Sequence, residues 1–267
     1  MALVPFPGPQ SAYPIQPEED DDSAGRMSFL EHLDELRKRI VNSLIAVAVG
    51  VLVSFTFIQS IYGFLMAPTM RVLPAGSKLI YTEPGEAFTL YITLSMIVGT
   101  LMASPFIMHQ VWLFIAPGLY ANEKRLAIPF VLFSTLGMLG GAAFNHYIMF
   151  PWMMRFFAGF NTQDLLFMPK LDSVFSLYTK FLVAMAAVFQ MPTLVYALAK
   201  MRLITARFLL AQFKYAILII FIISAVITPT GDPVTQTVFA APMIGLYLIG
   251  IAIAWVVGPK GKSAREV

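Results

Sequence analysis

Charged residues are scarce in this chain, which has 267 residues and only 12% Asp, Glu, Lys and Arg. An average soluble domain carries about a quarter charged residues, so the deficit excludes an ordinary soluble protein. Hydrophobic residues make up 58% of the chain and lie in long uncharged runs. Runs of about 20 apolar residues span the hydrocarbon core of a bilayer. The composition therefore predicts an integral membrane protein.

Cysteine is absent altogether. Its absence excludes disulfides, thiolate metal sites and a cysteine nucleophile. The three histidines, His32, His109 and His146, are scattered and lack the spacing of a metal site. The sequence also lacks the convergent set of nucleophile, base and acid that a membrane enzyme needs. We therefore expect no enzymatic activity, no metal or cofactor, and no nucleic-acid partner.

The uncharged intervals predict an all-α membrane protein with six transmembrane helices. The expected helices cover residues 40–60, 87–111, 126–150, 176–199, 208–227 and 236–257. With this arrangement, 13 of the 18 Lys and Arg residues fall on the side that carries both termini, and 5 fall on the other. Because cytoplasmic loops are enriched in Lys and Arg, we expect both termini to be cytoplasmic.

Three regions follow from this pattern. Residues 1–27 contain five prolines and an acidic run, which predicts a disordered tail. Residues 28–258 form the six-helix transmembrane domain, and residues 259–267 form a short basic cytoplasmic tail. The first and second outer loops, 59–86 and 157–180, are long, so we expect them to build an ordered extracytoplasmic cap.

Two features predict how the helices pack. Gly137 and Gly141 form a GxxxG motif on the third helix, a pattern that favours close approach of two membrane helices. The last outer connection, 228–233, is tight, so we expect the fifth and sixth helices to form a short antiparallel hairpin.

The stretch 28–39, SFLEHLDELRKR, is the last charged segment before the first apolar run. Ser28 and Glu31 fit a capping box, and apolar residues recur at helical spacing. We expect an amphipathic helix that lies along the membrane surface before the first crossing. Its acids fit a solvated helix face, but Glu35 has only Arg39 as an evident local partner at i,i+4.

A second acid, Glu123, lies in the loop 114–125, FIAPGLYANEKR, on the same predicted side of the membrane. After Asn122 it fits a simple role in the first turn of the third helix. Alternatively, two carboxylates on one cytoplasmic surface can receive two guanidinium groups. The residues alone leave both interpretations open.

Five stretches resemble the TatC family, the large multi-spanning subunit of the twin-arginine protein translocase. They are HLDELRKR at 32–39, the loop at 114–125, Ala67-Pro68, EPGEAF at 83–88 and TPTGD at 228–232. The resemblance covers residues 28–258. It implies a core receptor subunit that binds twin-arginine signal peptides at the cytoplasmic face and organises export of folded proteins driven by the proton-motive force. It also implies a location in the bacterial cytoplasmic (inner) membrane.

The resemblance implies partners and a binding site. The partners are the signal peptides of folded cargo, small single-span subunits of the TatA and TatB type, the lipid bilayer and further copies of the chain. Glu35 and Glu123 are implied to bind the paired arginines, because a guanidinium forks onto a carboxylate through two hydrogen bonds and an ammonium cannot. The residues implied to shape this site are His32, Leu36, Arg37, Arg39, Phe114 and Tyr120.

Gln190 lies midway along the fourth predicted helix, two residues before Pro192. A polar side chain beside a helix kink within lipid indicates either a functional residue or an amide that packs two helices. The family that the chain resembles often has Glu here, and Gln cannot titrate, so the sequence does not favour a proton carrier. Together with Thr228 and Gln236, this residue falls where the family's small subunits dock.

Four loop residues complete the candidate set: Pro68, Glu86, Phe88 and Asp232. We expect Pro68 and Phe88 to shape the outer cap, and Asp232 to act as a turn residue or a functional acid. The main alternative function is a small-solute secondary transporter. That class usually shows internal repeats and ionisable groups near the membrane midplane, and this sequence shows no convincing repeat.

Overall fold

A computed structural model of the chain describes residues 29–73, 79–115, 127–160, 162, 167–228 and 231–258, with all of their side chains except those of residues 29–32 and 115. Within these ranges the chain is helical apart from short connections and one isolated bridge between Ile80 and Lys170. The elements are α1 (Phe29–Thr56), α2 (Ile58–Met70), α3 (Glu86–Ile115), α4 (Ala127–Phe144), the π-helix η4 (Asn145–Met149), α5 (Phe150–Ala158), α6 (Leu171–Val188), α7 (Met191–Lys200), α8 (Ala206–Ala211), α9 (Phe213–Ile227) and α10 (Pro233–Val257).

In the described part of the chain, five helical stretches are long and apolar enough to cross a membrane: Leu33–Thr56, Glu86–Phe114, Ala127–Ala158, Leu171–Lys200 and Pro233–Val257. α9 is apolar but has only 15 residues. Large apolar side chains lie on the outside of the bundle, including Leu52 at 72% exposed, Val226 at 81% and Trp255 at 78%. Extensive exposed apolar surface indicates contact with lipid. The predicted class, an all-α multi-pass membrane protein, is therefore confirmed.

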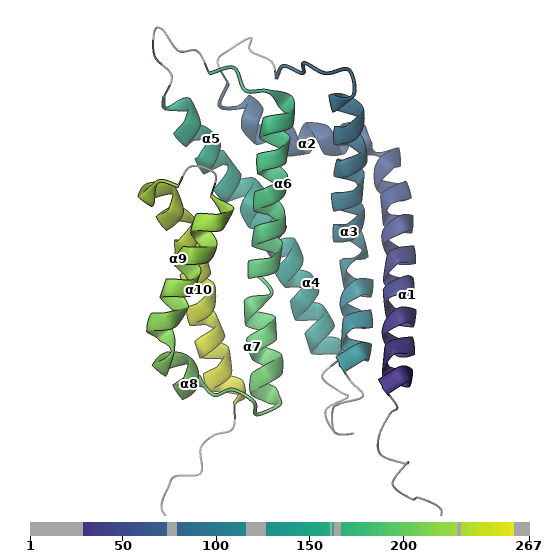
Figure 1. Cartoon of the computed structure of the whole chain (residues 1–267), viewed down its shortest axis with the longest axis vertical. Coiled ribbons are helices and arrows are strands. Elements are labelled where there is room, and N and C mark those ends of the chain that lie inside the picture. The colour runs from purple at the N-terminus through teal and green to yellow at the C-terminus, as the bar shows by residue number, and fades with distance from the viewer. Residues whose placement is uncertain are drawn as a thin grey trace, which may run out of the picture.

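The helices form an elongated bundle. α1, α3 and α6 follow its long axis, α4 crosses obliquely, and α8, α9 and α10 lie on the side away from α1 (Figure 1). α2 lies across the bundle near the end where α3 and α6 begin (Figure 1). α1 begins and α10 ends at the opposite end. This short helix between the first and second long helices occupies part of the loop that the sequence predicted to be ordered.

α1 corrects the expectation of a separate surface helix at 28–39. It is one continuous helix from Phe29 to Thr56, so the charged segment is the first part of the helix that carries the first apolar run. No proline interrupts it, and Leu, Arg and Lys are good helix formers. The backbone therefore has no reason to break after Arg39. The predicted capping contact between Ser28 and Glu31 lies outside the described residues.

The fourth predicted helix is divided, as expected, near Pro192. α6 ends at Val188 and α7 begins at Met191. Proline has no N–H, and its ring clashes with the carbonyl four residues earlier, which here belongs to Val188. The predicted start of this helix is wrong: α6 begins at Leu171 rather than at residue 176, so the loop before it is shorter than predicted.

Three other predicted helices differ in length. The third continues through the π-helical turn of η4 to Ala158, eight residues beyond the expected end. The fifth is divided at Gln212 into α8 and α9. The sixth, α10, has 25 residues, so the expectation of a short hairpin is wrong for its second helix.

Glycines allow close helix contacts at two places. A Cβ on Gly141 would lie 2.6 Å from the carbonyl oxygen of Met185, and one on Gly137 would lie 2.7 Å from that of Phe189. The GxxxG prediction is thus confirmed, with the end of α6 as the partner. The sequence analysis missed a second contact, where Gly50 of α1 packs directly against the backbone of Gly99 of α3.

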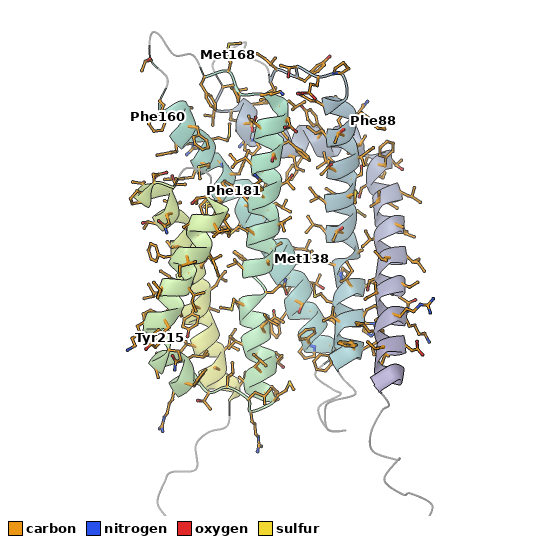
Figure 2. The ribbon with its side chains drawn as sticks, in the orientation of Figure 1. Phe88, Met138, Phe160, Met168, Phe181 and Tyr215 are labelled. Carbon is orange, nitrogen blue, oxygen red and sulfur yellow. The ribbon has the colours of Figure 1, made fainter. Side chains whose placement is uncertain are left out.

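The main apolar core joins α2, α3, α5, α6 and α10. Phe181 lies in the middle of the bundle (Figure 2) and is fully buried. Its ring packs edge-on against Phe239 with centroids 4.4 Å apart. A second cluster joins α7 to α8, α9 and α10. α1 packs mainly against α3, and the candidate site lies at the end of this helix pair where α1 begins and α3 ends.

Candidate functional site

Glu35 lies in the second turn of α1 and pairs with Arg39 one turn later. The Nη2 atom of Arg39 donates to Oε1 of Glu35 at 3.0 Å, and the two side chains are 24% and 19% exposed. The i,i+4 partner that the sequence predicted is the one observed. Fully exposed pairs contribute only about 0.2–1 kcal/mol, and this pair, largely shielded from water, lies at the upper end of that range.

Gln110 extends this pair from α1 to α3. Its Oε1 accepts from Nη1 of Arg39 at 3.4 Å, longer than the usual N–H···O distance of about 2.9 Å. Gln110 is only 6% exposed, and Nε of Arg39 is buried without a hydrogen-bond partner within the described part of the chain. The guanidinium is therefore shared between two acceptors and incompletely satisfied.

The sequence analysis missed Gln110. The signal available was a lone amide in an apolar helix, close to the helix end that faces the Glu123 loop. Polar side chains inside membrane helices are functional candidates by default. Gln190 stands out in the sequence because a proline follows it, whereas Gln110 has no proline beside it.

A cleft between α1 and α3 leads away from the ion pair. It encloses about 230 Å³, and its walls are Leu36, Arg39, Ile40, Ser43, Leu44, Val47, Ile107, Gln110, Val111 and Phe114. Of the residues implied by resemblance, Leu36, Arg39 and Phe114 line this cleft. The cleft is thus apolar along most of its length, and the Arg39 guanidinium in its wall is the one that pairs with Glu35.

The remaining predicted members of the site are placed as follows. Arg37 is exposed, and residues two apart on a helix do not face each other, so it is directed away from the Glu35–Arg39 pair. Only the backbone of His32 is described, in the first turn of α1. Tyr120 and Glu123 lie outside the described residues.

Gln190 lies at the break between α6 and α7. Its Nε2 donates to the backbone carbonyl of Ser134 on α4 at 3.0 Å, next to the close glycine contact at Gly137. Of the two interpretations of this residue, the geometry supports the amide that packs two helices.

Thr228 and Gln236 lie at the turn between α9 and α10. Thr228 Oγ1 donates to the Ser224 carbonyl at 2.9 Å, and Gln236 Nε2 donates to the Phe221 carbonyl at 2.8 Å. Ser224 Oγ in turn donates to the backbone carbonyl of Gln236 at 2.6 Å. Gln236 therefore joins α10 to α9, whereas the Thr228 hydroxyl closes the end of α9.

Glu86 forms the second ion pair of the described chain. Its Oε1 lies 2.8 Å from Nζ of Lys170, and the Glu86 side chain is 7% exposed. The backbone N–H and the hydroxyl of Thr82 also donate to this carboxylate. The hydrogen bond from Lys170 to the Glu86 carboxylate raises the pKa of the Lys170 ammonium above its usual value. The pair joins the beginnings of α3 and α6.

The other three loop residues differ in burial and contacts. Asp232 caps α10, because its carboxylate accepts from the backbone N–H of Thr235 at 2.8 Å and from the Thr235 hydroxyl at 2.6 Å. Pro68 is buried within α2. Phe88, by contrast, is 66% exposed on α3 and lies at the end of the bundle near α2 (Figure 2).

No metal centre is formed by the described side chains: no group of three or more His, Asp and Glu comes together among them. His146 is instead buried, stacked on Phe64 with ring centroids 4.2 Å apart and 3.3 Å from the hydroxyl of Tyr178.

Comparisons with known proteins agree with this geometry. A family model described as "Sec-independent protein translocase protein (TatC)" matches residues 31–242. A protein of that name from Koribacter versatilis is 39% identical over 98% of this chain and 97% of its own length. Another from Helicobacter pylori is 39% identical over 87% of this chain and 89% of its own. A crystal structure described as the twin arginine translocase receptor TatC matches with a TM-score of 0.72 at 38% identity, covering 84% of this chain and 98% of that one.

The apolar helices define a multi-pass membrane protein, which carries a charged pair at one end of its bundle. It is a transport component, not an enzyme. The chain belongs to the TatC family of Sec-independent protein translocase proteins.

Proposed function

We propose that this chain is the receptor subunit of a twin-arginine translocase and binds the paired arginines of signal peptides at Glu35 and Glu123. One observation carries the proposal: the Glu35 carboxylate already holds a guanidinium, that of Arg39, at 3.0 Å. Charge-assisted bonds between a guanidinium and a carboxylate are strong and directional. A carboxylate built to accept one guanidinium can accept another in the same geometry.

The cleft beside the pair supports the proposal. Signal peptides place an apolar segment after their basic residues. The α1–α3 cleft has the same order, with the ion pair at its mouth and Ile40, Leu44 and Val47 further along. A peptide whose arginine replaces Arg39 at Glu35 can therefore lay its apolar segment along α1 and α3.

Arg39 occupies the position of the ligand in the free receptor. Its second acceptor, Gln110, provides a place for the Arg39 guanidinium when a signal arginine takes Glu35. Arg39 then keeps a hydrogen-bond acceptor and, at 24% exposed, some contact with water, so its charge avoids the large penalty of isolation in an apolar environment. Arg39 thus lowers the affinity for the ligand and keeps Glu35 neutralised between binding events.

The proposed topology has six crossings, with α8 and α9 together forming the fifth and both termini in the cytoplasm of a bacterium whose inner membrane holds the protein. α2 then belongs to the extracytoplasmic cap. Residues 1–27 and 259–267 are cytoplasmic tails on the 28–258 domain. Because the chain has no cysteine, single cysteines placed near Lys38 and Thr82 can be tested with a membrane-impermeant thiol reagent. In intact cells only the second is expected to react.

The proposed partners are small single-span subunits of the TatA and TatB type and further copies of this chain, which together carry folded cargo across the membrane using the proton-motive force. The small subunits dock near Gln190, Thr228 and Gln236. Gln190→Leu is expected to reduce their co-purification. Unchanged co-purification would leave Gln190 with only its packing contact to Ser134.

Peptide binding tests the receptor assignment. The purified protein is titrated with a labelled peptide carrying paired arginines and with one carrying paired lysines. Glu35→Gln and Glu123→Gln are each expected to weaken binding of the arginine peptide at least tenfold. Asp34→Asn removes a neighbouring exposed acid and serves as the matched control, with affinity unchanged. Equal affinities for both peptides, or an effect of Asp34→Asn as large as that of Glu35→Gln, would contradict the assignment.

A further inference from the structure

A polar cleft opens between α3 and α6, at the end of the bundle opposite the Glu35–Arg39 pair. It encloses about 250 Å³, and seven of its nine lining residues are polar or charged. Thr89 and Thr93 lie one turn apart on α3, while Asp172, Ser176 and Lys180 follow one another at one-turn spacing on α6. Two helices that cross a membrane thus turn polar faces toward one another.

The depth of Lys180 identifies its environment. Lys200 ends α7, and Lys180 precedes it by about 20 residues, a rise of about 30 Å at 1.5 Å per residue. The hydrocarbon core is also about 30 Å thick. With Lys200 at one boundary of the core, Lys180 lies at the other, where the phosphates of that leaflet begin. The cleft therefore occupies the headgroup layer.

The charges in the cleft are ordered by depth. Lys180 lies at the deep end, and no hydrogen bond or ion pair of its side chain is found within the described part of the chain. The Thr179 hydroxyl beside it is also buried without a partner there. Asp172 lies two turns nearer the mouth. The adjacent Lys170 forms its ion pair with Glu86 at 2.8 Å.

We propose that this cleft binds the headgroup of a phospholipid that carries both a phosphate and a primary ammonium, as phosphatidylethanolamine does. The phosphate accepts hydrogen bonds from Lys180 and the nearby hydroxyls, and the ammonium donates to Asp172. In such a lipid the phosphate lies next to the hydrocarbon and the ammonium further out, the same order as lysine and acid in the cleft.

The surface below the cleft suits the acyl chains. Met96 lies one turn beyond Thr93 on α3, and Val183 lies one turn beyond Lys180 on α6. They are 54% and 57% exposed. A lipid with its headgroup in the cleft can lay its chains over both. This inference does not depend on the Glu35 site or on the direction of insertion.

Lipid titration of the purified full chain in detergent, read by native mass spectrometry and by the thermal unfolding midpoint, tests the proposal. Three lipids with the same acyl chains are compared: phosphatidylethanolamine, phosphatidylcholine, whose ammonium has no N–H, and phosphatidylglycerol, which has no ammonium. We expect phosphatidylethanolamine to bind at least fivefold more tightly than the other two. Similar binding of all three would overturn the proposal.

Variants locate the binding. Lys180→Leu is expected to weaken phosphatidylethanolamine binding at least fivefold, and Lys180→Arg to retain it. Asp172→Asn is expected to remove the preference over phosphatidylglycerol. Lys214→Leu, which removes an exposed lysine on α9, is the matched control and is expected to have no effect. Equal effects of Lys180→Leu and Lys214→Leu would refute the site.

Soluble probes separate a lipid from a free anion. Inorganic phosphate at millimolar concentration is expected to leave the unfolding midpoint unchanged and to displace no bound lipid, because it lacks the ammonium and the acyl chains. If phosphate alone displaces phosphatidylethanolamine, the cleft is an anion site and the lipid proposal is wrong.

Discussion

Replacing Arg39 with glutamine should make the receptor bind a twin-arginine peptide more tightly. In the free protein Arg39 holds the Glu35 carboxylate at 3.0 Å, so a signal arginine has to displace it. The Arg39→Gln variant keeps a hydrogen-bonding side chain, shorter than that of arginine, but removes the competing charge. An enhancement of this kind distinguishes a competitor from a supporting residue, whose loss would weaken binding.

The size of the effect follows from the exposure of the pair. Both side chains retain some contact with solvent, 24% and 19%, so the pair contributes about 1 kcal/mol, the upper value for surface ion pairs. Since 1.4 kcal/mol is tenfold in an equilibrium constant, removal of the competitor raises the association constant about fivefold. Arg39→Lys keeps the charge but loses the fork, and should fall between the wild-type protein and Arg39→Gln.

Gln110 gives the reasoning a second, independent test. If it receives the displaced Arg39 guanidinium, Gln110→Leu should weaken peptide binding about threefold, because about 0.6 kcal/mol of hydrogen bonding to Arg39 is lost in the bound state. In the Arg39→Gln background the same change should have no effect, because the displaced guanidinium is gone. Such non-additivity measures the coupling between the two residues.

The assay is fluorescence titration of a labelled twin-arginine peptide against each purified variant, with thermal unfolding as the control for folding. The proposed exchange at Glu35 is refuted if Arg39→Gln weakens peptide binding while the unfolding midpoint of the variant stays unchanged. It is also refuted if Gln110→Leu acts equally in both backgrounds. Glu35→Gln tests the binding site separately from the role of Arg39. Its loss of peptide binding is expected whether or not Arg39 competes for Glu35.

Three further predictions concern stability and are measured as thermal unfolding midpoints of the purified protein. Gly141→Ala should destabilise the protein by about 1–3 kcal/mol, because the new methyl group meets the α6 backbone. Gly245→Ala, with no atom within 4 Å of its Cβ, should not destabilise it. Equal losses of stability in the two variants would contradict the close packing of α4 on α6. Asp232→Ala should lower the stability by about 1 kcal/mol through the lost α10 cap, and Asp232→Ser should retain most of that stability. Equal stability of the two variants would show that the cap is unimportant. The pKa of Lys170 is raised, so its pairing with Glu86 stabilises the fold fully below the ordinary lysine pKa of 10.5, and this stability is lost as pH rises through the raised pKa. Lys170→Met should remove that loss of stability at alkaline pH. An identical pH profile in the variant would refute the linkage.

The membrane class and the position of the helices could be predicted because they depend on local composition. Runs without charge are long enough to define each apolar helix, and a proline fixes the break before Met191. The ends were less predictable. α6 starts five residues before the predicted position because Leu171, Val174 and Phe175 pack on the core.

The candidate site was only partly predictable for a related reason. Glu35 and Arg39 lie one turn apart, so spacing alone pairs them. Gln110 lies 71 residues further along the sequence, and only the packing of α1 against α3 brings it to Arg39. That packing depends on Gly50 and Gly99, two isolated glycines that do not form a recognisable motif.

The close contact of α1 with α3 also determines how recognition works at this site. At Gly50 and Gly99 the two backbones touch, leaving no room for a side chain, and α1 continues unbroken from Glu35 past this contact. The two helices therefore hold Glu35 and Gln110 at a fixed separation whether or not a peptide is bound. A preorganised site loses little free energy to ordering on binding. The affinity then depends on how well the incoming side chain fits the Glu35 carboxylate, so arginine peptides, which can fork onto it, should outrank lysine peptides even when Arg39 is absent.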